Sequence, residues 1–352
     1  MITVKVPARI CLLGDHQDYL GLPVIAASID RYLTLRATPQ DKAALTFDLS
    51  DLKKTYELGL EIDESEVKKG DFLAASLAVL ARKNIRPTKG YAISIHSDIP
   101  VNAGVSSSSA LVIAFMRFMV NAFSTAAVDP QQLADWANEA EVTFFGDPGG
   151  LMDHYSIALE ELRVIYPDSR TTSVLTRPSD LHMVLVESGI AKETVGVLSM
   201  AKEKALEALA IAQSLNPPIN YHDATASDIA AYKSHLSPEL FTYWQAAIAN
   251  HEITRSGIAL LSAPNVSGEI IRLAALINAH QFYLQTAIQN TPELMQQQMK
   301  VALTAGGLAA KVIGSGGGGC FFVLSAVDKQ QAIIERVLES GARSAYTVKI
   351  TP

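Results

Sequence analysis

The first part of the chain alternates between short apolar or β-branched runs and turn residues. The runs VIAASI, YLTLRAT, ALTFDLS and YAISIHS have the composition and the two-residue alternation that are typical of strands. Between them, FLAASLAVLARK and the stretch after Ala110 have apolar residues at helical spacing. We therefore expect a strand-rich region in this half of the chain.

The pattern changes from Ala191 onward. Four long segments then have helical composition: KETVGVLSMAKEKALEALAIAQSL, PELFTYWQAAIANHEITRSGIALL, EIIRLAALINAHQFYLQTAI and PELMQQQMKVALTAGG. Strands return only in AAKVIGS, CFFVLS and AYTVKIT. Because strands and helices segregate rather than alternate, the pattern predicts an α+β fold. We expect a strand-rich N-terminal domain over residues 1–180 and a helix-rich C-terminal α/β domain over residues 181–352.

Composition and charge narrow the class of protein. With 49% hydrophobic and 18% charged residues, the 352-residue chain has the composition of an ordered globular protein. Its formal net charge of −7 gives no electrostatic reason to expect a nucleic-acid or membrane partner. The only cysteines, Cys11 and Cys320, offer no disulfide framework. Lys5, Pro7 and Arg9 interrupt the apolar run that a signal peptide needs, so we expect a cytoplasmic protein.

A serine-rich loop is the first candidate for chemistry. GVSSSSALVIAFMRF, from Gly104 to Phe118, follows the strand YAISIHS and runs directly into an apolar helical stretch. Serines at a helix start can cap its free N–H groups, and those N–H groups together with the helix dipole form an anion site. A plain cap remains an alternative, but a cap needs one serine and the loop has four. The segment therefore favours a phosphate cradle.

A glycine-rich run, GSGGGGC, spans Gly314 to Cys320 and formally contains G-x-G-x-x-G. A dinucleotide-binding fingerprint must open a helix, whereas the following CFFVLSAV is strand-like. The chain also lacks a GxxxxGK[ST] sequence, which excludes a P-loop. The run predicts a turn between two strands that can approach a ligand closely, and a purely structural hairpin is at least as well supported. Lys311, just before it, could reach a phosphate or could be an exposed strand residue.

A third loop, PARICLLGDHQDYLG, crowds Asp15, His16 and Asp18 into the turn after an apolar strand. Carboxylates beside a histidine could bind a metal or the hydroxyls of a polyol, and turn-forming aspartates are the structural alternative. Arg9 lies within the apolar strand, where a buried guanidinium calls for an anionic partner.

The segment EAEVTFFGDPGGLMDHYS joins Glu141 to Asp153 across a Pro-Gly-Gly turn. A glutamate and an aspartate beside a phosphate cradle would suit Mg²⁺ coordination and general-base catalysis. Composition alone does not place them there. His154 would point away from Asp153 in locally extended chain, so we leave it out of the predicted site.

Taken together, the three loops resemble those of the GHMP kinases, the family of galactokinase, homoserine kinase, mevalonate kinase and phosphomevalonate kinase. PARICLLGDHQDYLG is similar to the galactokinase signature, PVNAGVSSSSA to the phosphate loop, and KVIGSGGGGCFFVL to the C-terminal glycine motif. The motifs occur in the family's order and span nearly the whole chain. The resemblance implies a two-lobed α+β GHMP kinase fold and ATP-dependent phosphorylation of a small-molecule hydroxyl.

The resemblance also implies residue roles. Asp153 matches the catalytic aspartate and Arg9 the arginine that assists it, while Ser108 and Glu141 match the Mg²⁺ ligands. The positions that match sugar-binding residues of galactokinases are Asp15, His16, Asp18 and Gly150. The positions that match contacts to the ATP phosphates are Gly104, Ser106, Ser107, Ser108, Ser109, Gly316 and Gly317. The implied partners are ATP and a sugar, with the protein as a monomer or a homodimer.

The chain departs from the galactokinase pattern at several positions. The signature normally has Asn where Cys11 stands and Glu where Asp15 stands, and no tyrosine occurs near Ser199, where galactokinases have one that contacts the sugar. Since polar networks discriminate strongly between hydroxyl patterns, these changes could move the preferred sugar away from galactose. We expect a sugar kinase that acts at the anomeric C1 hydroxyl.

Two alternative functions were weighed against the motifs. A mevalonate-type kinase would have small residues where this chain has QDY. A non-catalytic sugar or ATP sensor would tend to alter the catalytic elements, whereas Arg9, Ser108, Glu141 and Asp153 are all present. Catalysis is therefore the favoured prediction.

Overall fold

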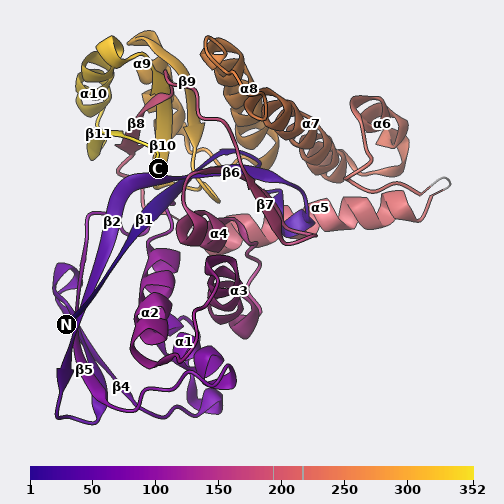
Figure 1. Ribbon diagram of the computed structural model, residues 1–352. Helices are drawn as coiled ribbons and strands as arrows, with labels where there is room; N and C mark the ends of the chain where they lie inside the picture. Colours follow the sequence, from indigo (N-terminus) through magenta and orange to yellow (C-terminus); the bar gives the residue numbers. More distant parts are fainter. Residues whose placement is uncertain (193, 216–217) are drawn as a thin grey trace.

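Two β-sheets organise the chain, one in each half of the sequence (Figure 1). The computed structural model describes residues 1–192, 194–215 and 218–352. Within them, strands dominate the first half and helices the second, so the predicted α+β class is confirmed.

The larger sheet has seven strands in the order β4-β3-β5-β2-β6-β7, with β1 paired to β2. Its strands are β1 (Ile2–Leu13), β2 (Val24–Gln40), β3 (Ala44–Leu49), β4 (Lys54–Gly59), β5 (Gly90–Ser97), β6 (Leu162–Tyr166) and β7 (Thr171–Val174). The sequence predicts separate strands in VIAASI and YLTLRAT, but β2 is one strand of 17 residues. The polar pair Asp30 and Arg31 between them is absorbed by a bulge, where the partners of Pro7 and Ala8 jump from Tyr32 to Ile29.

Four helices accompany this sheet. They are α1 (Phe72–Arg82), α2 (Ser107–Phe123), α3 (Pro130–Glu141) and α4 (Met152–Leu159). The apolar stretch that follows the serine run forms α2, whose Phe115 and Phe118 are fully buried. Asp129 caps α3 by accepting from Gln131 N–H at 2.8 Å. The ends of α2, α3 and α4 thereby present the serine loop, Glu141 and Asp153.

The second sheet has the order β11-β8-β10-β9. Its strands are β8 (His182–Glu187), β9 (Gly307–Val312), β10 (Cys320–Ser325) and β11 (Ser344–Val348). The helices of this half are α5 (Thr194–Gln213), α6 (Ala226–Ala231), α7 (Pro238–Leu261), α8 (Ile270–Tyr283), α9 (Glu293–Thr304) and α10 (Gln330–Glu339). Short 3₁₀ or π turns occur at Asp18–Leu20, Ser50–Leu52, Glu64–Glu66, Thr143–Phe145, Lys233–His235, Leu284–Ile288 and Val327–Lys329.

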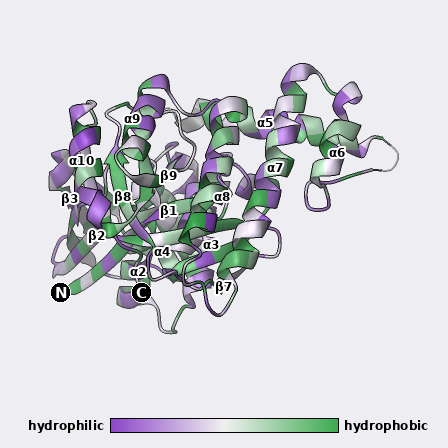
Figure 2. Cartoon of the chain, turned by 90° about the horizontal axis from the view of Figure 1, so that it is seen from above, coloured by the Kyte–Doolittle hydropathy of each residue, from purple (hydrophilic) through white to green (hydrophobic). Residues whose placement is uncertain are grey.

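The main hydrophobic core is shared by the two sheets. Met183 of β8 and Phe322 of β10 belong to the same buried cluster as the strands β1 and β2. Figure 2 shows hydrophobic strands at the centre and α5, α6 and α7 projecting to one side, where Trp244 centres a separate cluster. The first sheet ends at Val174 and the second begins at His182, and the division into domains 1–180 and 181–352 stays a prediction. Across the described ranges, no helix has the length and apolar character needed to span a membrane.

Candidate active site

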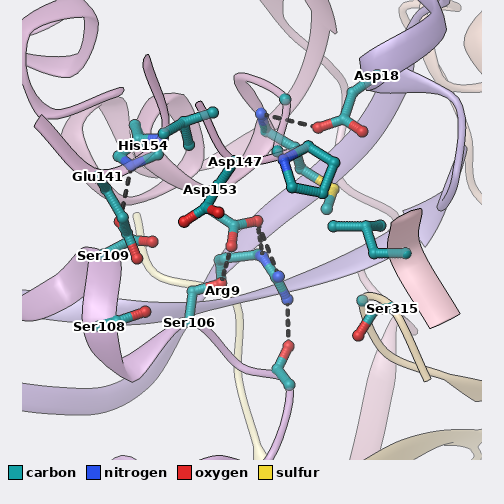
Figure 3. A pocket seen from close by; sticks show the side chains of 18 of the residues that line it. Arg9, Asp18, Ser106, Ser108, Ser109, Glu141, Asp147, Asp153, His154 and Ser315 are labelled. Atoms are coloured by element: carbon teal, nitrogen blue, oxygen red, sulfur yellow. Dashed lines mark hydrogen bonds and ion pairs between the residues drawn. The ribbon is translucent and has the colours of Figure 1, made fainter. Parts of the chain in front are cut away.

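The loops singled out in the sequence line one cleft of about 290 Å³. Its wall combines the strand β1, the turn after it, the serine loop, the end of α3, the start of α4 and the glycine-rich turn. Most of the predicted residues line it: Arg9, Asp15, His16, Asp18, Gly104, Ser106, Ser107, Ser108, Ser109, Glu141, Gly150 and Asp153. Figure 3 shows Arg9, Ser106 and Asp153 at the centre of this group.

Arg9 and Asp153 form the central ion pair of the cleft. Arg9 Nε donates to Asp153 Oδ1 at 2.8 Å, and Arg9 NH1 donates to the Gly104 carbonyl at 2.6 Å (Figure 3). Ser106 Oγ donates to the other carboxylate oxygen, Asp153 Oδ2, at 2.6 Å. Burial acts to raise the pKa of Asp153, but Arg9 and the Ser106 hydroxyl outweigh it and bring that pKa to about 2. Asp153 is therefore a carboxylate at neutral pH.

The serine run does not cap α2 with its side chains, and here the structure differs from the capping interpretation. Ser106 precedes the helix in the left-handed region, at φ 64°, and makes no capping hydrogen bond because its hydroxyl is engaged by Asp153. The backbone N–H groups of Ser107, Ser108 and Ser109 find no acceptor among the described residues, and all three residues line the cleft. Free N–H groups at the positive end of a helix dipole are an anion site.

Glu141 ends α3 beside the serine loop. Its Oε2 accepts from His154 Nε2 at 2.8 Å, and both side chains line the cleft (Figure 3). His154, excluded by the sequence prediction, reaches Glu141 because the segment is helical rather than extended. No group of three or more His, Cys, Asp or Glu in the described chain could hold a metal by itself. The donors present fit Mg²⁺, which typically takes one or two protein oxygens together with substrate phosphates.

Asp18 and Gly150 approach each other closely on the opposite wall. A Cβ on Gly150 would lie 2.0 Å from Asp18 Oδ2, so any larger residue at this position would displace the Asp18 carboxylate. Asp18 accepts from Tyr19 N–H at 2.9 Å and from Met152 N–H at 3.4 Å. Burial, followed by the negative charge of Asp153, raises the pKa of Asp18 to about 6.

Asp15 and Lys311 form a fully buried ion pair, with both side chains at 0% exposure. Lys311 Nζ also donates to the carbonyls of Cys11 at 3.0 Å and Val312 at 2.9 Å, while Asp15 Oδ1 accepts from Gly314 N–H at 2.8 Å. Lys311 is therefore not the exposed residue that the sequence allowed. Both oxygens of Asp15 already have donors, and its sugar-binding role stays a prediction.

His16 is held by partners on either side of its ring. Its Nδ1 pairs with Tyr19 Oη and its Nε2 with the Ser315 carbonyl, each at 3.0 Å. His16 therefore ties the loop after β1 to the glycine-rich turn, and its own contact to a sugar stays a prediction.

The glycine-rich turn reaches the cleft through different residues from those expected. Gly314 and Ser315 line the cleft, whereas Gly316 and Gly317 are not among its lining residues. Gly317 N–H donates to the Asn290 carbonyl at 2.6 Å, and a Cβ on Gly316 would lie 2.4 Å from that oxygen. The run is needed for close backbone packing, and an ATP contact at Gly316 and Gly317 stays a prediction.

Lys192 is a cleft residue that sequence reasoning missed. A Cβ on Gly104 or on Gly314 would lie 3.8 Å from Lys192 Nζ, which places the ammonium group between the serine loop and the glycine-rich turn. Within the described part of the chain it forms no hydrogen bond or ion pair. Burial, followed by the charge of Arg9, lowers the pKa of Lys192 to about 8. Its signal in the sequence is only a lone lysine after a strand.

Comparisons with known proteins agree with the geometry. The family model for the "GHMP kinases N terminal domain" matches residues 71–161, and that for "GHMP kinases C terminal" matches residues 262–343. The galactokinase of Pyrococcus furiosus is 25% identical over 346 residues, covering 96% of this chain and 92% of the relative. The galactokinase of Chloroflexus aurantiacus is 24% identical over 348 residues, covering 96% and 87%.

Solved structures share the fold. Lactococcus lactis galactokinase complexed with galactose has a TM-score of 0.85 at 22% identity, over 99% of this chain and 93% of that one. Methanococcus jannaschii mevalonate kinase has a TM-score of 0.75 at 16% identity, over 100% and 98%. The expected GHMP kinase fold, with strands concentrated in the first half of the chain and helices in the second, is confirmed.

Proposed function

The chain belongs to the GHMP kinases and is a galactokinase-like, ATP-dependent sugar kinase, and we propose that it phosphorylates the anomeric hydroxyl of a monosaccharide. The observation that carries this proposal is the arrangement of Arg9, Ser106 and Asp153 between a free helix N-terminus and a loop of hydroxyl acceptors. One side of the cleft suits a triphosphate and the other a polyol, with a carboxylate between them.

The triphosphate binds at the first turn of α2 in this proposal. The N–H groups of Ser107, Ser108 and Ser109 and the helix dipole attract its oxygens. Ser108 and Glu141 would hold Mg²⁺, which supplies charge neutralisation between the phosphates when it is bound. We also assign Lys192 to the γ-phosphate, because its largely buried ammonium group has no anionic partner of its own in the described chain.

Asp153 orients the attacking hydroxyl. The sugar oxygen forms a bond to the γ-phosphorus as the bond from that phosphorus to the bridging oxygen of ADP breaks, and the hydroxyl proton passes to Asp153. A carboxylate with a pKa of about 2 is a weak base, so it accepts the proton only as the oxygen–phosphorus bond forms. That timing suits phosphoryl transfer, whose transition state is loose and depends mainly on positioning and electrostatics.

The polyol side of the cleft is formed by the turn after β1 and by the Gly150 turn. Asp18, held by two backbone N–H groups, is placed to accept hydrogen bonds from sugar hydroxyls. One structural relative is a galactokinase in complex with galactose. In this chain the aspartate Asp15 is paired with the buried Lys311, so we expect the contacts to the end of the sugar remote from Asp153 to differ from those that the galactokinase signature implies. We therefore propose a sugar 1-kinase and leave galactose as one substrate to be tested.

An ADP-release screen tests this function. The protein with MgATP is offered galactose, arabinose, glucuronate, heptose phosphates, N-acetylhexosamines and mevalonate. We expect turnover with at least one free sugar that carries an anomeric hydroxyl. Turnover with mevalonate alone, or ATP binding without turnover on any acceptor, would refute the proposal.

A further inference from the structure

A largely buried polar network in the cleft wall, formed by Asn138, His154 and Glu141, links the proposed magnesium side to the sugar side. We propose that His154 and Asn138 are positioning residues: His154 aims the Glu141 carboxylate at the magnesium–nucleotide complex, and Asn138 fixes both His154 and the Gly150 carbonyl. This inference rests on the proposed function, because it takes Glu141 as a magnesium ligand. Neither His154 nor Asn138 is assigned a role by the sequence motifs.

The contacts of His154 carry the first step. His154 lies on α4 directly after Asp153, and its side chain is 2% exposed. Its Nε2 lies 2.8 Å from Glu141 Oε2, whose side chain is 11% exposed (Figure 3). One carboxylate oxygen of Glu141 is thus held by the imidazole. The other oxygen, Oε1, has no hydrogen-bond partner among the described residues and is left for a cation.

Asn138 determines which ring nitrogen of His154 carries the proton. Asn138 lies one helical turn before Glu141 on α3 and is 6% exposed. Its Nδ2 donates to the Gly150 carbonyl at 2.8 Å and lies 3.4 Å from His154 Nδ1. Because an amide nitrogen can only donate, Nδ1 of His154 is the acceptor and the proton is assigned to Nε2, which donates to Glu141.

The carboxylate of Glu141 is held by an imidazole and not by a lysine or arginine. Among the described residues its only hydrogen-bond or ion-pair partner is His154, which fixes the direction of the carboxylate. Glu139, two residues earlier on the same helix, provides the contrast. It pairs with Arg82 at 3.1 Å and with Lys83 at 3.2 Å, and these two cations neutralise it. Two nearby glutamates on one helix thus differ in their partners: Glu139 pairs with two cations, whereas Glu141 pairs with an imidazole.

The same network reaches the sugar side. The Gly150 carbonyl, fixed by Asn138, belongs to the turn whose glycine approaches Asp18. One buried asparagine therefore holds the backbone next to Asp18, the proposed acceptor for sugar hydroxyls, and, through His154, the Glu141 carboxylate on the phosphate side. Loss of Asn138 should disturb both sides, whereas loss of His154 should disturb the metal side first.

Manganese binding tests the network without relying on turnover. The free Mn²⁺ signal in electron paramagnetic resonance is titrated with protein and ADP. Replacing His154 by Leu removes the donor and keeps bulk, and we expect Mn²⁺ affinity in the ADP complex to fall by ~10-fold or more, as for partners that hold metal-binding carboxylates. His154→Gln retains an N–H donor and should restore most of the affinity. Glu139→Gln is the matched control and should bind Mn²⁺ like the wild type.

Two further variants, Glu141→Gln and Asn138→Ala, distinguish an error in the proposed magnesium site from an error in the proposed network. Wild-type Mn²⁺ affinity in Glu141→Gln would refute the magnesium site of the proposed function itself. A loss in Glu141→Gln together with wild-type affinity in His154→Leu would overturn only the network. If His154→Leu does not fold, Asn138→Ala takes its place, with a smaller loss of Mn²⁺ affinity and a raised sugar KM expected. Unchanged values of both quantities in Asn138→Ala would likewise overturn the network.

Discussion

The buried pair of Asp15 and Lys311 allows a quantitative test of how this cleft is held together. In Lys311→Met, the Asp15 carboxylate loses its ammonium partner and keeps the backbone N–H of Gly314, and the Cys11 and Val312 carbonyls each lose a donor. Both charged side chains are fully buried, so water cannot replace the lost ammonium. Removing one partner of such a pair costs about 3–5 kcal/mol of unfolding free energy.

The loss of unfolding free energy in Lys311→Met should depend on pH. In the native chain, burial acts to raise the pKa of Asp15, but Lys311 and other neighbours outweigh it and lower that pKa. Native Asp15 therefore contributes stability that is present above its unfolded pKa and is lost only at more acid pH. Without Lys311, burial dominates and raises the pKa of Asp15 in the folded variant above its value in the unfolded chain. Asp15 of the variant therefore takes up protons on folding, and lower pH favours the folded state. The difference in unfolding free energy between the wild type and Lys311→Met should therefore become smaller as the pH falls from 7 to 5.

Urea unfolding at both pH values measures these effects. The two tryptophans, Trp136 on α3 and Trp244 on α7, report on both halves of the chain, and coincident fluorescence and circular dichroism transitions check that unfolding is cooperative. The double variant with Asp15→Asn should cost less than the sum of the single changes, by about 1–3 kcal/mol. If Lys311→Met lost less than about 1 kcal/mol of unfolding free energy at pH 7, or the same amount at both pH values, Lys311 would not be what stabilises the buried charge of Asp15.

Three further predictions concern catalysis. Asp153→Asn should keep nucleotide affinity by calorimetry but lower kcat by ~10²–10⁴-fold in ADP release, and near-normal turnover would move the base elsewhere. With the pKa of Asp18 at about 6, protonation below that pH removes an acceptor, so sugar KM should rise as pH falls through 6. Asp18→Asn should abolish this dependence, and a profile that persists in the variant would assign it to another group. Lys192→Met should lower kcat by ~10²-fold with sugar KM little changed, and Lys192→Arg should recover part of it. A rise in sugar KM alone would place Lys192 at the sugar instead.

Local patterns in the sequence predicted the parts of the site that lie next to each other in the chain. The serine run before an apolar stretch predicted a helix start open to anions, and α2 begins at Ser107. Segregated strand and helix patterns predicted the α+β class. The predicted first strand carrying Arg9 is β1, with the Asp15 turn directly after it.

Long-range pairing explains what the sequence did not predict. Lys311 and Asp15 are 296 positions apart, and nothing in either segment indicates that the two side chains meet in the core. A locally extended chain would turn His154 away from the site, whereas the helix α4 directs it to Glu141. The phosphate contact predicted for Gly316 and Gly317 stays a prediction, and nothing in the sequence indicated that the backbone of this turn packs against Asn290. Each of these outcomes depends on tertiary contacts.

The position of the phosphate on the product decides whether the protein is a sugar 1-kinase. The protein is incubated with MgATP and the best sugar acceptor from the screen, and the product is examined by proton-coupled ³¹P NMR. For a sugar 1-kinase we expect a phosphomonoester resonance coupled to the single anomeric proton of the sugar. A phosphate coupled to the two protons of a primary alcohol, or no sugar phosphate at all, would contradict this expectation.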